Sequence, residues 1–117
     1  MNVTVTDSNA PPDRRALYVR ELLRLYRATP GVLGHVRRAD RQLAGALFDR
    51  GIPLFAVENA LLVGAARRVL NNASASPPPA IRSLHYFTAI IHEMLARPLG
   101  YRDLEELRAR LRAALER

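Results

Sequence analysis

The side chains with the clearest potential for chemistry in this sequence are arginines gathered in its first third. Between residues 14 and 41, two acids, Glu21 and Asp40, oppose eight arginines: Arg14, Arg15, Arg20, Arg24, Arg27, Arg37, Arg38 and Arg41. This segment carries a net charge of +6, out of +7 for the whole chain. A local excess of this size raises the concentration of polyanions at the surface, and nucleic acid is the usual polyanion.

The spacing of these arginines predicts contacts with phosphate groups. Arg20, Arg24 and Arg27 recur every three or four residues, so they share one face of a helix. A guanidinium group forms paired hydrogen bonds with phosphate oxygens, and a row of such groups follows a phosphate backbone well. If the first two helices pack antiparallel, a second set joins this row: Arg37, Arg38 and Arg41.

Three alternatives to phosphate binding by the arginines stay open. All 18 basic residues are arginine, and codon bias in a GC-rich bacterial genome accounts for that as well as phosphate binding does. The charged face also fits an ordinary solvated surface that keeps the protein soluble. The third alternative is a docking surface for an acidic protein.

Patterns for catalysis, metal binding and cofactor binding are absent from the sequence. The chain has no cysteine, which excludes disulfides, thiolate ligands and thiol catalysis. Its histidines, His35, His85 and His92, lack the close spacing of a metal site. There is no glycine-rich phosphate loop or nucleophile elbow. We therefore predict that the protein is not an enzyme and has no cofactor or metal.

The elements that must position the arginines are helices. Apolar residues recur at helical spacing, and no segment alternates as a strand does. The pattern predicts an all-α fold, a compact bundle of about five helices. We expect these helices at about residues 11–28, 34–50, 53–70, 80–96 and 101–115. Gly51 suits a left-handed helix end, because it lacks the Cβ that makes that conformation costly.

The apolar stripes of the first two helices indicate which sides face the core. Tyr18 and Tyr26 lie on the apolar face of the first helix, so we expect core packing rather than base stacking. The stripe of the second helix consists of Val36, Ala39, Leu43 and Leu47. Arg37, Arg38 and Arg41 lie off that stripe.

Two later helices have distinctive patterns. Residues 54–66 are apolar almost all round, which is typical of a central helix packed by neighbours on several sides. The helix at 101–115 instead has one narrow seam, made of Leu104, Leu107, Leu111 and Leu115. We expect this seam to fold back onto the domain, with pairing to a protein partner or in a homodimer as the alternative.

The chain reads as one helical domain, residues 11–117, preceded by a flexible tail at 1–10. The tail has neither the basic start nor the apolar run of a signal peptide. Apolar stretches such as residues 60–66 are too short to span a bilayer. We expect a cytoplasmic protein without a membrane partner.

Residues 47–57 have the spacing of a helix-turn-helix, with Gly51 in the turn. In a DNA reader, the first turn of the second helix presents hydrogen-bonding side chains to the major groove. Here that turn begins Pro53-Leu54-Phe55, which cannot read donor and acceptor patterns on base edges. We interpret this segment as an antiparallel helical hairpin.

Two segments together resemble a known family. One is Arg50-Gly51-Ile52-Pro53-Leu54, and the other is Ile81-Arg82-Ser83-Leu84-His85-Tyr86-Phe87. The pair is similar to helical C-terminal, DnaD-like modules of bacterial replication-initiation proteins on plasmids and mobile elements. The resemblance covers about residues 40–95 and implies contacts with single-stranded DNA and helicase-loading partners, with Arg82 and Tyr86 facing the DNA. The winged-helix domain that usually precedes such modules is missing, which favours an accessory role.

The sequence predicts a non-enzymatic accessory module that acts in replication or mobile-element function. We expect it to contact the phosphates of nucleic acid, with DNA as the first candidate. The residues expected to make these contacts are Arg20, Arg24, Arg27, Arg37, Arg38, Arg41, Arg82 and Tyr86. The alternative is a protein-interaction adaptor or a small helical subunit of a larger ribonucleoprotein complex.

Overall fold

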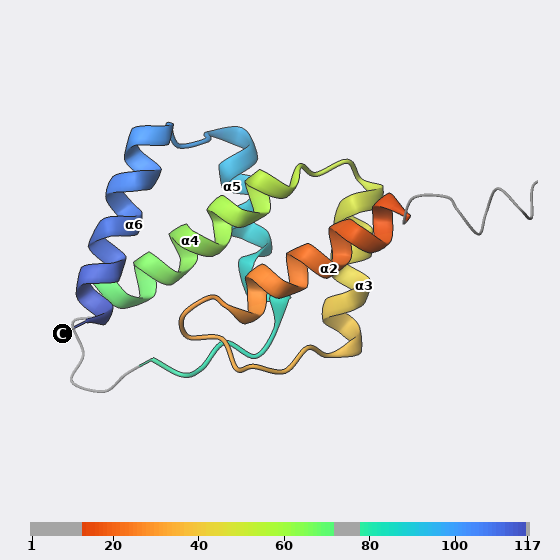
Figure 1. Cartoon of the computed structure of the whole chain (residues 1–117), viewed down its shortest axis with the longest axis horizontal. Helices are drawn as coiled ribbons and strands as arrows, with labels where there is room; N and C mark the ends of the chain where they lie inside the picture. Colours follow the sequence, from red (N-terminus) through yellow and green to blue (C-terminus); the bar gives the residue numbers. More distant parts are fainter. Residues whose placement is uncertain (1–12, 72–77, 117) are drawn as a thin grey trace, which may run out of the picture.

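The computed structural model describes residues 13–71 and 78–116, and within these ranges the regular structure is helical (Figure 1). There are five α-helices and one 3-10 turn, η1, in these ranges: α2 Arg14–Arg27, α3 Arg38–Asp49, α4 Leu54–Leu70, η1 Leu84–Phe87, α5 Thr88–Ala96 and α6 Tyr101–Leu115. The predicted all-α bundle is therefore confirmed. The predicted tail at 1–10, and Pro11 and Pro12, lie outside the described residues.

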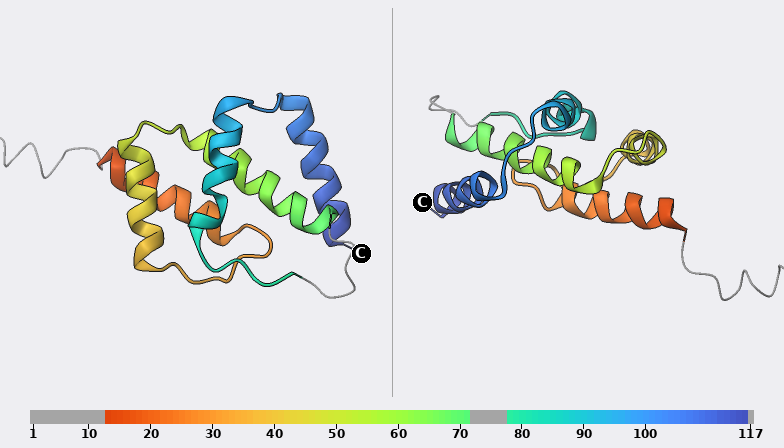
Figure 2. Two further views of the ribbon diagram at one scale, coloured as in Figure 1. Left: turned by 180° about the vertical axis from the view of Figure 1, so that it is seen from behind. Right: turned by 90° about the horizontal axis from the view of Figure 1, so that it is seen from above.

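The central element is α4, as its apolar sequence predicts. It packs against α2, α5, α6 and η1. Figure 2 shows α3 and α5 on one side of α4, and α2 and α6 on the other. Eight of its residues are buried: Ala56, Val57, Ala60, Leu61, Val63, Gly64, Ala65 and Ala66. Because these small residues let neighbouring helices approach closely, α4 forms the middle of a single apolar core.

Local signals account for several helix ends. The Asp13 carboxylate accepts a hydrogen bond from Arg15 N at 3.0 Å and so caps the first turn of α2. Thr29 Oγ1 donates to Leu25 O at 2.8 Å where that helix stops. Gly51 has φ +75°, the left-handed conformation predicted for the end of α3.

Two predicted helix starts are wrong, and one tertiary contact explains both. Residues 34–37 and 80–83 are not helical: α3 begins at Arg38, and α5 begins at Thr88 after the 3-10 turn. Val32 and Ile81 form an isolated parallel β-bridge. Ile81 N donates to Gly31 O at 2.8 Å and Leu33 N donates to Ile81 O at 3.0 Å. Ile81 O, which a helix begun at residue 80 would pair with residue 85, is thereby taken by Leu33 N, and the bridge lies directly before the predicted start at residue 34, so pairing overrides the local helical pattern.

The inward stripe of α3 also differs from the prediction. Ala39 is exposed, and the buried positions are Asp40, Ala44, Gly45 and Leu47. Asp40 is fully buried and turns inward because its carboxylate accepts hydrogen bonds from two backbone N–H groups, Arg37 and Leu84, each at 2.9 Å. A polar side chain with such partners can take a core position that sequence patterning assigns to an apolar one.

The antiparallel hairpin predicted for residues 47–57 does not form. Both α3 and α4 pack against α2, whereas they make hardly any contact with each other. In Figures 1 and 2 the two helices run in clearly different directions from the turn at residues 50–53. The Tyr18 hydroxyl donates to Ile52 O at 2.8 Å and so holds this turn against α2.

The last helix folds back onto the domain, which was the preferred interpretation of its leucine seam. It packs along α4. Leu111 is buried, Leu104 and Leu107 are half-buried, and Leu115 is 51% exposed. The seam is thus largely used within the chain.

A close contact between α4 and η1 involves Gly64 on α4. A Cβ placed at Gly64 would lie 2.6 Å from Cε1 of Phe87, whose ring is fully buried. We expect Gly64→Ala to lower the free energy of unfolding by about 1–3 kcal/mol, despite alanine's better helix propensity. A Cβ at the buried Gly45 would meet only the guanidinium end of the long, exposed Arg15 side chain, which can shift at the expense of its surface ion pair with Asp49, so Gly45→Ala should change stability by less than about 1 kcal/mol. Equal losses of the two variants in urea denaturation would contradict this packing.

Candidate nucleic-acid interface

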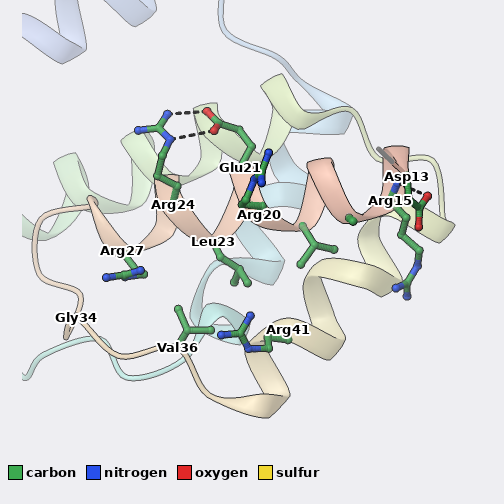
Figure 3. A pocket seen from close by; sticks show the side chains of 12 residues that line it. Asp13, Arg15, Arg20, Glu21, Leu23, Arg24, Arg27, Gly34, Val36 and Arg41 are labelled. Atoms are coloured by element: carbon green, nitrogen blue, oxygen red, sulfur yellow. Dashed lines mark hydrogen bonds and ion pairs between the residues drawn. The ribbon is translucent and has the colours of Figure 1, made fainter. Parts of the chain in front are cut away.

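A concave surface of about 870 Å³ lies between α2 and the segment that leads into α3 (Figure 3). Five arginines line it, four from α2 and one from α3: Arg15, Arg20, Arg24, Arg27 and Arg41. Arg15 lies at one end, and the other four, with the apolar residues between them, form the surface that we call the arginine groove. Figure 3 shows Arg20, Arg24 and Arg27 along α2, with Arg41 on the opposite wall.

The amphipathic pattern of α2 explains its half of the groove. Leu22, Leu23 and Tyr26 are buried, so the arginines at 20, 24 and 27 must project from the other side of the helix. All three are exposed. The apolar part of the groove is contributed by Val19, Leu23 and Val36. Charged groups therefore edge a surface whose middle is apolar.

Asp40 positions the opposite wall. Its Oδ2 accepts from Arg37 N and its Oδ1 accepts from Leu84 N, which fixes the first turn of α3 in the core. Because neighbouring helix positions are 100° apart, Arg41 then points out of the core and toward the groove. Burial raises the pKa of the Tyr26 hydroxyl, and the nearby Asp40 carboxylate raises it further.

Only one of the four groove arginines is neutralised by a carboxylate within the described parts of the chain. Arg24 forms a two-pronged ion pair with Glu21, at 2.9 Å from Nε and 2.6 Å from Nη2. The hydrogen bond from Arg24 lowers the pKa of Glu21. The other three make no ion pair there: Arg20, Arg27 and Arg41. The groove thus keeps most of its positive charge available.

Arg15, at the far end of the groove, is instead tied to α3. Its Nε lies 2.9 Å from Asp49 Oδ1, and its Nη2 lies 3.2 Å from Oδ2. This hydrogen bond is the largest cause that lowers the pKa of Asp49. The pair joins the start of α2 to the end of α3, whereas the helices diverge toward Arg27 and leave the groove open (Figure 1).

This ion pair predicts a pH effect. We expect Arg15→Gln to raise the pKa of Asp49 toward the ordinary value of about 3.9. Because the folded-state pKa of Asp49 lies below the unfolded-state value, the stabilisation by the pair is complete above about pH 3.9 and is lost as pH falls through the folded pKa. Carboxyl NMR titration measures this, with Glu93 as the unaffected control, because Arg67 and not Arg15 lowers the pKa of Glu93. An unchanged Asp49 titration in the variant would contradict the pair.

The remaining candidate residues do not border the arginine groove. Arg37 and Arg38 are exposed at the start of α3, but they are not among the residues that line it. Arg82 and Tyr86 are exposed on and before η1, a separate part of the surface. There the guanidinium of Arg68 lies 5.9 Å from the centre of the Tyr86 ring, close enough for a cation–π contact.

The two tyrosines of α2 lie in or against the core, as predicted. Tyr26 is fully buried and makes an edge-to-face contact with Phe87, with ring centres 6.3 Å apart. Tyr18 is half-buried and contacts Phe48 in the same manner at 5.3 Å. Both rings are therefore occupied by packing rather than offered to bases.

Sequence reasoning missed the groove's apolar middle and the role of Asp40. The signal for Asp40 was present, because an acid three residues after a helix start is the reciprocal half of a capping box. No sequence pattern indicated the apolar middle, because its residues come from two separate segments. Val19 and Leu23 lie on α2, whereas Val36 lies in a segment that was expected to be helical.

Comparisons with known proteins add no family. No protein-family model, curated protein or solved structure matches this chain significantly. In the ranges that the structure describes, no helix is both long and apolar enough to cross a membrane, and no three acidic or histidine side chains gather as a metal site would require.

Proposed function

We propose that this protein is a non-enzymatic accessory module that binds nucleic acid through its phosphates in the arginine groove. The observation that carries the proposal is the convergence of Arg20, Arg24, Arg27 and Arg41 on one surface that contains few carboxylates. Guanidinium groups suit phosphate because their planar donors make paired, charge-assisted hydrogen bonds with its oxygens.

The spacing of the arginines along α2 favours a linear polyanion as the ligand over a single phosphate ion. Arg20 and Arg24 are one helical turn apart, about 6 Å along the axis, and Arg27 continues the row by about 4.5 Å. Successive guanidinium groups at such intervals engage successive charges of an extended chain. A compact ion would leave most of the row unused.

The apolar middle of the groove supports binding without sequence reading. Val19, Leu23 and Val36 offer no hydrogen-bonding side chains to base edges. The half-buried Val19 and Val36 leave apolar surface that unpaired bases can contact, which favours single-stranded nucleic acid over a duplex. We infer weak dependence on base sequence, a preference for single strands, and DNA as the first candidate.

A salt titration tests the proposal directly. Fluorescence anisotropy with a labelled single-stranded oligonucleotide should give a log–log slope of about −2 to −3 between binding constant and salt, as expected for three or four phosphate contacts. Duplex DNA and single-stranded RNA of the same length serve as comparisons. Affinity that does not change between low and moderate salt would refute phosphate binding.

Arg82 and Tyr86 extend the proposal through the DnaD-like resemblance. We infer that η1 makes a second, weaker contact with the nucleic acid. We also infer that the protein acts in replication or mobile-element biology, in the cytoplasm. The exposed Tyr86 ring, 47% accessible, supports base stacking there. Tyr86→Ala should then weaken single-strand binding but leave the salt slope unchanged, because stacking releases no counterions.

An adaptor that docks an acidic protein segment is the second candidate. The apolar middle and arginine edges of the groove also suit an amphipathic helix with acidic flanks. A pull-down with and without nuclease distinguishes the two. A partner that is lost on nuclease treatment supports the nucleic-acid proposal, and one that is retained supports the adaptor.

A further inference from the structure

A second concave surface lies between α4, α5 and α6, on elements that contribute nothing to the arginine groove. Its volume is about 380 Å³, within the range of small-molecule sites. Apolar side chains from all three helices and from the link at residues 97–100 form much of its wall: Val63, Ala66, Leu70, Met94, Leu99 and Leu107. We call this surface the apolar pocket.

The helix arrangement explains why the apolar pocket is open. Both α5 and α6 pack against α4, but they make hardly any contact with each other. The short link that begins at Arg97 and ends at Gly100 keeps them apart at one end, and α4 bridges them (Figure 2). Two helices that pack on a third without contacting each other leave a hollow between them, and here apolar residues border it.

The positive charge at the edge of the apolar pocket favours an anionic ligand. Three arginines border it, Arg67, Arg97 and Arg110, against one acid, Glu93. Glu93 is already engaged, because its oxygens lie 3.0 and 2.6 Å from Nη1 and Nη2 of Arg67. In the parts of the chain described, Arg97 and Arg110 make no ion pair. This edge would repel a cationic ligand, and a neutral polar ligand would accept only weaker hydrogen bonds from it than an anion does.

We propose that the apolar pocket binds a free amphipathic monocarboxylate, with its apolar body among Val63, Leu70 and Met94 and its carboxylate at Arg97 and Arg110. An engineered apolar cavity of about 150 Å³ holds one benzene molecule, so 380 Å³ has room for a medium-length acyl chain. The ligand's carboxylate would accept charge-assisted hydrogen bonds from these two guanidinium groups, which have no carboxylate partner in the described parts of the chain.

Binding of decanoate to the full chain tests this site. Isothermal titration calorimetry should give saturable binding of one decanoate per chain. Decanol, which has the same chain without the charge, should bind at least about tenfold more weakly. A second readout is displacement by decanoate of the fluorescent probe 8-anilinonaphthalene-1-sulfonate, which also joins an apolar body to an anion.

Matched variants locate the binding. Arg97→Gln and Arg110→Gln should each weaken decanoate binding about three- to tenfold. Arg102→Gln changes an exposed arginine of α6 that does not line the pocket, and Arg27→Gln changes one in the arginine groove; both should bind decanoate as the unchanged protein does. Circular dichroism confirms that each variant is folded.

The outcomes are decisive in either direction. Weaker binding confined to Arg97→Gln and Arg110→Gln, together with discrimination against decanol, establishes the site. The proposal is overturned by any of three results: no saturable binding of decanoate, equal affinity for decanol, or equal losses in the Arg27→Gln control.

Discussion

Replacing Asp40 with alanine is expected to lower the free energy of unfolding by about 2–5 kcal/mol, a larger change than for any other substitution that we propose. The Asp40 side chain is fully buried, and its two oxygens accept hydrogen bonds from Arg37 N and Leu84 N. Removing the carboxylate leaves both N–H groups without their partner, one of them buried, and it also leaves a small cavity. This loss is large compared with the total free energy of unfolding of a typical domain, which is roughly 5–15 kcal/mol.

Urea denaturation followed by circular dichroism measures this effect. Asp103→Ala, in the exposed first turn of α6, is the matched control, with an expected loss below about 1 kcal/mol from its helix-end position. Asp40→Asn should fall between the two, because an amide oxygen can replace only one of the two acceptors. Similar stabilities of the Asp40→Ala and Asp103→Ala variants would contradict the structural role of Asp40.

Neutralising the arginine groove is expected to have the largest effect on binding. The combined variant Arg20→Gln, Arg27→Gln and Arg41→Gln removes the three guanidinium groups that have no carboxylate partner among the described residues. We expect its affinity for a single-stranded oligonucleotide to fall about 1000-fold or more at low salt, since each of the three charge-assisted contacts contributes about 1.5 kcal/mol or more. Its salt slope should also approach zero.

A charge-matched control separates the groove from general attraction. Replacing three exposed arginines outside the groove with glutamine lowers the net charge by the same amount: Arg50, Arg102 and Arg112. This control should keep nearly the full affinity, with a loss of at most about threefold from long-range attraction. If both triple variants lose affinity equally, the protein responds to net charge alone and the groove has no special role.

Most of the helices were predictable because their signals are local. Helix α6 begins and ends as its leucine spacing predicts, and α4 is central because it is apolar on every side. The errors at 34–37 and 80–83 arise from pairing between Val32 and Ile81, which are 49 positions apart in the sequence. Such pairing is invisible to periodicity, which reports only on neighbours along the chain.

The candidate site was predictable in part. The row of arginines on α2 follows from spacing alone, because residues three and four apart share a helix face. Which wall Arg41 joins depends on how α3 lies in the fold, and the buried Asp40 fixes the start of α3 against η1. Arg37 and Arg38 were grouped with Arg41 by sequence, yet Arg37 precedes α3 in extended backbone, and neither Arg37 nor Arg38 lines the groove.

The most direct test of the groove is to observe its arginines while nucleic acid binds. In 15N-labelled protein, the Nε–Hε signals of Arg20, Arg27 and Arg41 can be followed by NMR as a single-stranded oligonucleotide is added. The account predicts that these three signals shift together and saturate with the anisotropy curve, while those of Arg102 and Arg112 stay in place. Shifts spread evenly over the arginines, or absent from these three, would contradict it.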